Sequence, residues 1–169
     1  DVNFLEGLRR ATEEAGALLI FDEVMTSRHG SSGLHGMYGL GPDLVTFGKY
    51  VGGGLSFGAF GGRADILDRF DPSRPDAWPH AGTFNNNILS MTAGYVGLSE
   101  VYTPEVAQAF FDQGERCRQQ LEVLLSDLNL PVHVTGLGSM MALHCGIKAP
   151  TAPYALPPGY SDLYELVHL

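Results

Sequence analysis

Two side chains of complementary chemistry, an amine and a carboxylate, stand next to segments that could hold them together. Lys49 precedes three consecutive glycines at residues 52–54 and is one of two lysines in the chain, the other being Lys148. Asp22 directly follows an apolar run at residues 17–21. A lysine that can form a Schiff base and an acid that can pair with a pyridine nitrogen are the minimum for holding pyridoxal phosphate. The pair therefore predicts such a site, the alternatives being an ordinary surface lysine and an acid that merely ends a strand.

The apolar run before Asp22 is typical of a short strand buried on both faces of an α/β sheet. A second strand is predicted just before Lys49, so both candidate residues would follow strand ends. Amphipathic periodicity, capping residues and glycine punctuation predict the other elements. We expect helices at residues 3–15, 64–70, 88–102 and 104–128, strands at 17–21, 43–47, 57–62, 132–134 and 139–144, and a glycine-rich loop at 29–41.

Composition excludes several classes of function. The chain has 169 residues and a formal net charge of −9, which disfavours nucleic acid because phosphate contacts need clustered Lys and Arg. No apolar run of about 18 residues exists, so no membrane span is expected. The six histidines lack metal-ligand spacing, so no metal site is predicted. Cys117 and Cys145 are interpreted as buried thiols, and the absence of a targeting signal favours a cytoplasmic location.

An ordered set of motifs resembles the class III aminotransferases, which are fold-type I pyridoxal-phosphate enzymes, and most of all their glutamate-1-semialdehyde 2,1-aminomutase branch. No single motif is decisive, but they follow family order and spacing across residues 1–145. The matching runs are Leu19-Ile20-Phe21-Asp22-Glu23-Val24-Met25-Thr26 with Arg28, Gly41-Pro42-Asp43-Leu44, Gly48-Lys49 with Gly52-Gly53-Gly54, Gly58-Ala59-Phe60-Gly61-Gly62-Arg63, and Ala81-Gly82-Thr83.

The resemblance implies roles for residues around Lys49. Lys49 would bond covalently to the cofactor aldehyde and, once released by substrate, move a proton. Asp22 would pair with the pyridinium nitrogen, and Val24, on the same side of an extended chain as Asp22, would pack against the cofactor ring. Met25 stands where many class III transaminases carry Gln, and Met favours the aminomutase branch. Arg28 is expected to touch a substrate carboxylate or to form a structural salt bridge.

Gly82 and Thr83 would bind the cofactor phosphate of a partner subunit, so the resemblance implies a homodimer acting on a small amino substrate. The alternative is a simple turn before a helix. Residues 84–87 depart from the aminomutase pattern, which keeps other reactions open. The alternatives are a transaminase for an ω-amino acid or another amine, and a truncated, catalytically incomplete subunit.

The resemblance also implies a domain organisation. The expected fold is the fold-type I large domain, three-layered α/β/α around a mostly parallel sheet. We expect residues 1–130 to form the C-terminal part of that domain and residues 131–169 to begin the small C-terminal domain. Because family chains are more than twice as long, we expect the large domain to be incomplete, with exposed apolar faces and reduced activity.

Overall fold

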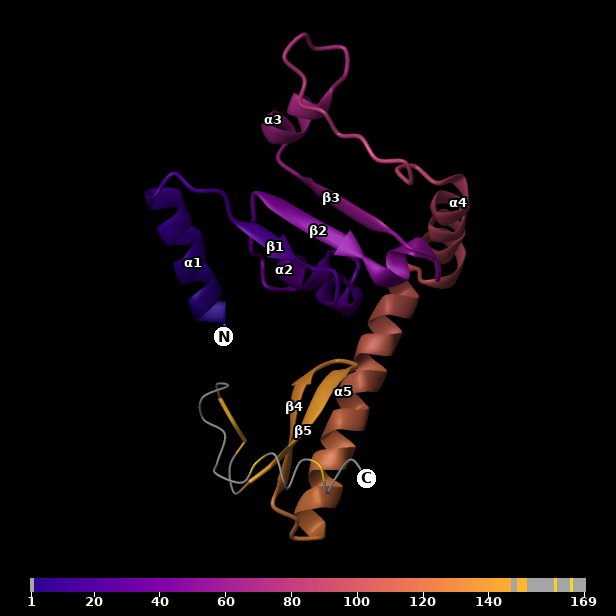
Figure 1. Ribbon diagram of the computed structural model, residues 1–169. Helices are drawn as coiled ribbons and strands as arrows, with labels where there is room; N and C mark the ends of the chain where they lie inside the picture. The colour runs from indigo at the N-terminus through magenta and orange to yellow at the C-terminus, as the bar shows by residue number, and fades with distance from the viewer. Residues whose placement is uncertain (1, 147–148, 152–159, 161–164, 166–169) are drawn as a thin grey trace. The chain divides into compact units, whose positions relative to one another are not determined.

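A three-stranded sheet carries both candidate residues (Figure 1). It consists of β1 (Ile20–Asp22), β2 (Leu44–Gly48) and β3 (Gly58–Gly62), with β2 in the middle. Strands β1 and β2 are parallel, with Asp22 opposite Thr46, whereas β2 and β3 are antiparallel. The computed structural model describes residues 2–146, 149–151, 160 and 165. The predicted α/β class is confirmed.

The chain divides into two compact units, Asp1–Ala107 and Gln108–Leu169. The first contains the sheet, and the second contains most of the long helix α5 (Pro104–Asp127) and a hairpin. The hairpin joins β4 (Val132–Leu137) to β5 (Met140–Cys145). Strand β4 is longer than the predicted 132–134, whereas β5 is shifted by one residue from the predicted 139–144. The expected domain boundary between residues 130 and 131 stays a prediction. The sequence also predicts a last helix, capped by Ser161, and this segment lies largely outside the described residues.

The first helix, α1 (Val2–Glu14), agrees with its prediction and ends at a left-handed glycine. Gly16 has φ +65°, and the Ala17 amide donates to the Thr12 carbonyl at 2.8 Å, which satisfies an orphan carbonyl of the last turn. The following strand differs from expectation because it begins at Ile20. Leu19 is buried, but Leu18 and Ile20 are 49% and 53% exposed. Burial on both faces is therefore wrong for this strand, because its outer face has no cover within the described residues.

The expected loop at residues 29–41 contains a helix, α2 (Gly33–Met37), preceded by the 3-10 helix η1 (Thr26–His29). The prediction was wrong here because glycine content indicated a loop, whereas a buried carboxylate from outside the segment holds the first turn of α2. Glu23 accepts hydrogen bonds from the amides of Leu34 and His35, at 2.8 and 2.6 Å.

Two helices lie at opposite ends of β3 (Figure 1). Helix α3 (Ala64–Leu67) continues into the 3-10 helix η3 (Asp68–Phe70), which together match the helix predicted at 64–70. Helix α4 (Ile88–Val96) begins at Asn87, whose side chain accepts from the amides of Leu89 and Ser90. It continues into a π-helical turn, η4 (Gly97–Val101), so the helix predicted at 88–102 is two elements.

Further findings on the described residues concern the two cysteines, membrane-spanning helices and metal ligands. Cys145 is buried, but Cys117 is exposed, so the expectation of two buried thiols was wrong for Cys117 on α5. None of the helices in the described part is long and apolar enough to cross a membrane. The same residues include no group of three His, Cys, Asp or Glu side chains that could hold a metal ion.

Candidate active site

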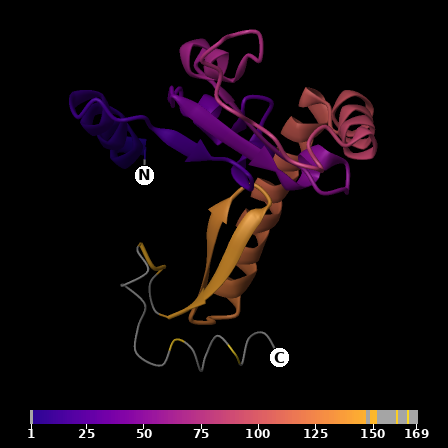
Figure 2. The ribbon, with the colours of Figure 1, turned by 45° about the horizontal axis from the view of Figure 1, so that its top comes forward.

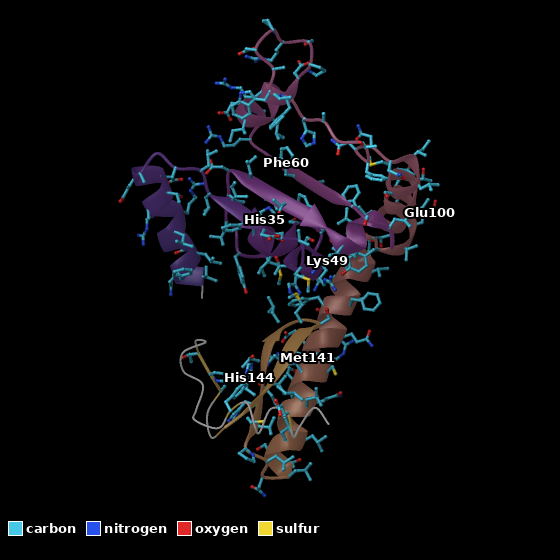
Figure 3. All side chains as sticks on the ribbon, viewed as in Figure 1. His35, Lys49, Phe60, Glu100, Met141 and His144 are labelled. Atoms are coloured by element: carbon cyan, nitrogen blue, oxygen red, sulfur yellow. The ribbon has the colours of Figure 1, made fainter. Side chains whose placement is uncertain are left out.

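Lys49 sits at an abrupt change of backbone direction at the end of β2. Gly48 is extended and Lys49 begins the 3-10 turn η2 (Lys49–Gly52) with φ +54°, in the left-handed region. A residue with a Cβ pays a steric cost there, so surrounding structure must hold Lys49 in place. Its side chain is exposed, and Nζ lies 2.6 Å from Sδ of Met25 (Figure 3). The turn thus presents the amine to solvent beside a weak acceptor.

Close backbone packing holds the Lys49 turn against α4. A Cβ added to Gly53 would overlap the Ala93 carbonyl, and one added to Gly94 would overlap the Val51 carbonyl. The two backbones therefore approach through reciprocal glycines. Gly53 also has φ +61°, which favours glycine. These glycines give a physical reason for the composition around Lys49: they allow η2 and α4 to lie in direct contact.

Asp22 ends β1 with one carboxylate oxygen occupied. Its Oδ1 accepts from Thr46 Oγ1 at 3.0 Å and from the Val24 amide at 3.1 Å. Among the described residues no hydrogen bond ends on Oδ2, and the side chain is exposed. Asp22 is therefore oriented by two donors while its second oxygen stays available for a third.

Val24 and Met25 lie between Asp22 and Lys49 in the local geometry. Strand β1 has ended, and both residues occupy a turn, so strand alternation does not govern where Val24 points. A Cβ on Gly48 would lie 3.4 Å from a methyl carbon of Val24 and 3.1 Å from the Phe57 carbonyl. Val24 therefore packs over the backbone just before Lys49.

Arg28 is engaged by neighbouring side chains. Its Nε donates to the Met25 carbonyl at 3.0 Å, and its guanidinium carbon lies 5.6 Å from the ring centroid of Tyr50. Tyr102 OH donates to the Arg28 carbonyl at 2.7 Å, and burial raises the pKa of that hydroxyl. The guanidinium is thus held over an aromatic ring, while a role in binding substrate stays a prediction.

Gly82 and Thr83 lie on an exposed turn that leads into α4. The Asn85 amide donates to the Gly82 carbonyl at 3.0 Å, and a Cβ on Gly82 would lie 2.7 Å from Asn85 Oδ1. Thr83 makes no hydrogen bond to Lys49 or Asp22 within the described residues. The structure therefore places Met25 beside Lys49 and Val24 beside Asp22 and Gly48, and within the described residues no hydrogen bond links Thr83 to Lys49 or Asp22.

Sequence reasoning assigned no role to Glu23, which is only 2% exposed. Besides the two α2 amides, its Oε1 lies 2.7 Å from Nδ1 of His35. Gly33 has φ +66°, and a Cβ there would overlap this carboxylate. No local pattern in the sequence marks this role, because the two amides that Glu23 binds lie 11 and 12 residues further along the chain.

Asp43 is a second buried carboxylate without an assigned role. It accepts from the Leu19 amide at 2.7 Å and from Arg63 and Arg9, each at 2.8 Å. The Leu19 amide, followed by the two guanidinium groups, holds the pKa of this carboxyl well below its usual value. Asp43 thereby joins α1, the start of β1 and the end of β3, which fixes the strands that carry Asp22 and Lys49.

The first unit contains a hollow of about 370 Å³. Its lining includes Ser27, His35, Tyr50 and Tyr102, but neither Lys49 nor Asp22. The side chains of the two candidate residues therefore do not line it, although Tyr50 directly follows Lys49 in the chain.

Known proteins are related to this chain in sequence. A family model described as aminotransferase class-III matches residues 1–156. A β-phenylalanine transaminase of Variovorax paradoxus is 50% identical over 142 residues, covering 84% of this chain and 32% of that protein. Glutamate-1-semialdehyde 2,1-aminomutase 1 of Macrococcus caseolyticus is 47% identical over 139 residues, covering 82% and 32%. The chain thus spans about a third of the length of these relatives.

Solved structures give the same result. A β-phenylalanine aminotransferase from Variovorax paradoxus superposes with a TM-score of 0.93 and 44% identity, covering 99% of this chain and 39% of that one. A glutamate-1-semialdehyde aminomutase from Pseudomonas aeruginosa, in complex with PMP, has a TM-score of 0.74 and 29% identity, covering 87% and 34%. The fold predicted from the motifs, that of the fold-type I pyridoxal-phosphate enzymes, is confirmed.

Proposed function

Because the chain belongs to the aminotransferase class-III family, we propose that it carries the cofactor-lysine segment of a pyridoxal-phosphate-dependent enzyme that moves an amino group. One observation carries the proposal. Asp22 ends β1 and Lys49 directly follows β2, at the carboxyl ends of two adjacent parallel strands, and Asp22 is in register with Thr46, three residues before Lys49. Ligands of open α/β sheets bind at that edge.

The residues present fit the cofactor. Lys49 offers an exposed amine, and Asp22 keeps Oδ2 available for a protonated ring nitrogen. When bound, pyridoxal phosphate supplies an electron sink for substrate carbanions. Val24 and Met25 would line the cofactor from the turn between these two residues. Gly82 and Thr83 would supply a backbone amide and a hydroxyl to the phosphate in the site of a partner subunit.

Each residue would contribute a distinct physical effect. Nζ of Lys49 would attach the cofactor and then carry a proton to and from the substrate carbon. Oδ2 of Asp22 would hold a proton on the ring nitrogen through a charge-assisted hydrogen bond, worth roughly twice a neutral one. Thr46, by donating to Oδ1 at 3.0 Å, orients that carboxylate. The strained Lys49 turn would keep the amine at the carboxyl edge of the sheet.

For the reaction, we favour intermolecular transamination of a β-amino acid. The likeness to the β-phenylalanine transaminase supports this choice in both sequence and structure, at 50% identity and a TM-score of 0.93. Internal amino transfer of the glutamate-1-semialdehyde type is the second candidate. Met25 beside the Lys49 amine favours it, because Met lacks the strong hydrogen-bonding groups of Gln.

A homodimer and a cytoplasmic location are part of the same proposal. Exposed apolar side chains on α4 support a partner subunit, since Ile88, Leu89 and Tyr95 are 77%, 68% and 72% exposed. The alternative proposal is a catalytically incomplete subunit. It is supported by the length of the chain, which spans about a third of the length of its relatives.

Borohydride trapping tests the proposal. The protein is incubated with pyridoxal phosphate, reduced, digested and examined by peptide mass spectrometry. We expect an adduct mainly on Lys49, absent in Lys49→Ala and weakened in Asp22→Asn, with Lys148→Ala as the matched lysine control. An adduct spread equally over Lys49 and Lys148, or none, would contradict the proposal and favour the incomplete subunit.

A second experiment separates the two reactions. A transaminase needs an added keto acid to turn over β-phenylalanine, whereas an aminomutase isomerises its single substrate without an acceptor. Amino transfer that depends on the keto acid supports the first candidate, and acceptor-independent isomerisation of glutamate 1-semialdehyde supports the second.

A further inference from the structure

The segment at residues 71–87 connects α3 to α4 without a helix or strand of its own. It leaves α3 and returns alongside β3, as two views show (Figure 1, Figure 2). Near the middle of the segment, the Trp78 amide donates to the Arg69 carbonyl at 2.6 Å. Asn87 caps α4 at the end of the segment. Gly82 and Thr83 lie between these two attachments, so something must hold the chain on their N-terminal side.

A cluster of aromatic rings supplies that contact. We call Phe60, Phe70, Trp78 and His80 the β3 aromatic cluster; Phe60 lies on β3, as Figure 3 shows. The His80 ring meets Phe60 at 5.6 Å between centroids and Phe70 at 5.8 Å, edge to face in both cases. Phe70 in turn meets Phe60 at 5.5 Å and Trp78 at 5.6 Å. Such pairs are favourable beyond the area they bury.

On the C-terminal side of Thr83, a tight turn and a helix cap hold the backbone. Gly82 and Asn85 form a tight turn, in which a Cβ on Gly82 would press against the Asn85 side chain. Asn87 then fixes the start of α4, which the reciprocal glycines hold against the Lys49 turn. The backbone is therefore held on both sides of Thr83, by the His80 ring contacts before it and by the capped start of α4 after it.

We propose that His80, whose ring packs edge to face against both Phe60 and Phe70, is a positioning residue that holds Gly82 and Thr83 in place for binding the cofactor phosphate. This inference rests on the proposed function, because it requires that the protein binds pyridoxal phosphate. Within that function, it assigns His80 an effect on binding of the phosphate group alone. His80 lies three residues before Thr83 and makes ring contacts with two elements outside the segment. It touches no reacting atom and acts only by fixing the backbone that carries Thr83.

The test compares pyridoxal phosphate with pyridoxal, which lacks the phosphate. Absorbance titration of the full chain gives the dissociation constant for each compound. We expect His80→Ala to weaken binding of pyridoxal phosphate about tenfold, the order expected for losing two aromatic pairs, and to leave pyridoxal unchanged. His80→Phe should restore affinity because it keeps an aromatic edge. Phe4→Ala, which removes an exposed ring on α1, is the matched control.

Equal weakening of both compounds, or no change in either, would overturn the proposal. Hydrogen exchange at residues 79–87 provides a measurement that needs no cofactor. Faster exchange there in His80→Ala than in the wild type or Phe4→Ala supports the positioning role, and unchanged exchange overturns it. A wild-type chain that forms no adduct on Lys49 contradicts the proposed function first, which the borohydride experiment detects separately.

Discussion

The Nζ atom of Lys49 lies 2.6 Å from the Sδ atom of Met25, so the exposed amine ends against a thioether. A thioether is a weak acceptor, which leaves the amine ready to react. We expect Met25→Gln to slow formation of the Lys49 adduct about threefold, because the amide oxygen can hold the amine by roughly 0.5–1 kcal/mol. Met25→Leu should react at nearly the wild-type rate. Stopped-flow absorbance after mixing with pyridoxal phosphate gives both rates, and a faster Met25→Gln would contradict this account.

The backbone of Lys49 makes a second prediction, about stability. Its φ of +54° suits glycine and strains any residue with a Cβ. Lys49→Gly should therefore be more stable than Lys49→Ala by about 1 kcal/mol, since only glycine relieves the strain. Urea denaturation followed by circular dichroism measures the difference. Equal stability of the two variants would show that the left-handed backbone costs nothing here.

Gly33, which is buried, and Gly39, which is exposed, form a matched pair with the same backbone conformation. Their φ values are +66° and +65°, but a Cβ on Gly33 would overlap the Glu23 carboxylate, whereas Gly39 has open space. Gly39→Ala should cost about 1 kcal/mol from backbone strain alone. Gly33→Ala should cost about 1–3 kcal/mol more, because it displaces a buried acceptor from the amides of Leu34 and His35. Chemical denaturation of both variants tests the contrast, and equal losses would exclude a role for Glu23.

Asp43 predicts a dependence of stability on pH. Its pKa in the folded protein lies below the ordinary value, because it accepts from the Leu19 amide, Arg63 and Arg9. The unfolded chain therefore binds more protons than the folded one as pH falls below about 4. The stabilisation from Asp43 is complete above that pH and is lost progressively below it. Asp43→Asn should be less stable than the wild type at pH 7.

The difference in free energy of unfolding between the wild type and Asp43→Asn should become smaller as pH falls from 5 to 2. Comparing the two proteins cancels the titration of the other carboxylates. Urea denaturation at several pH values measures this difference, with Asp68→Asn as a control at an exposed carboxyl on η3. A difference that is constant with pH would contradict the predicted shift of the Asp43 pKa.

The sequence predicted correctly those elements that are determined by residues close together along the chain. The strand before Lys49, the long helix at 104–127 and the Asn87 cap all follow from periodicity and capping, which are local properties. The motif order also predicted the class III family, which the comparisons confirm. The roles of Lys49, Asp22, Val24, Met25, Gly82 and Thr83 stay predictions.

Helix α2 was missed for a physical reason that the sequence cannot display. Glycine and serine are poor helix formers, so residues 29–41 indicate a loop. The helix exists because Glu23, ten residues upstream of Gly33, brings a buried carboxylate to its first amides. A stabilising contact from a residue outside the segment cannot be recognised from the pattern of residues within that segment.

The sequence by itself determined that an amine and an acid follow two strands of an α/β fold of the class III aminotransferase family. Only the tertiary structure decided how they are held: Thr46 orients Asp22 through Oδ1, and Lys49 is strained at a turn packed on α4. It also decided that His80 packs against both Phe60 and Phe70. Residue type and spacing carry the chemistry, because reactivity belongs to the side chain. Geometry between distant segments comes from packing, which depends on contacts that the linear order does not contain.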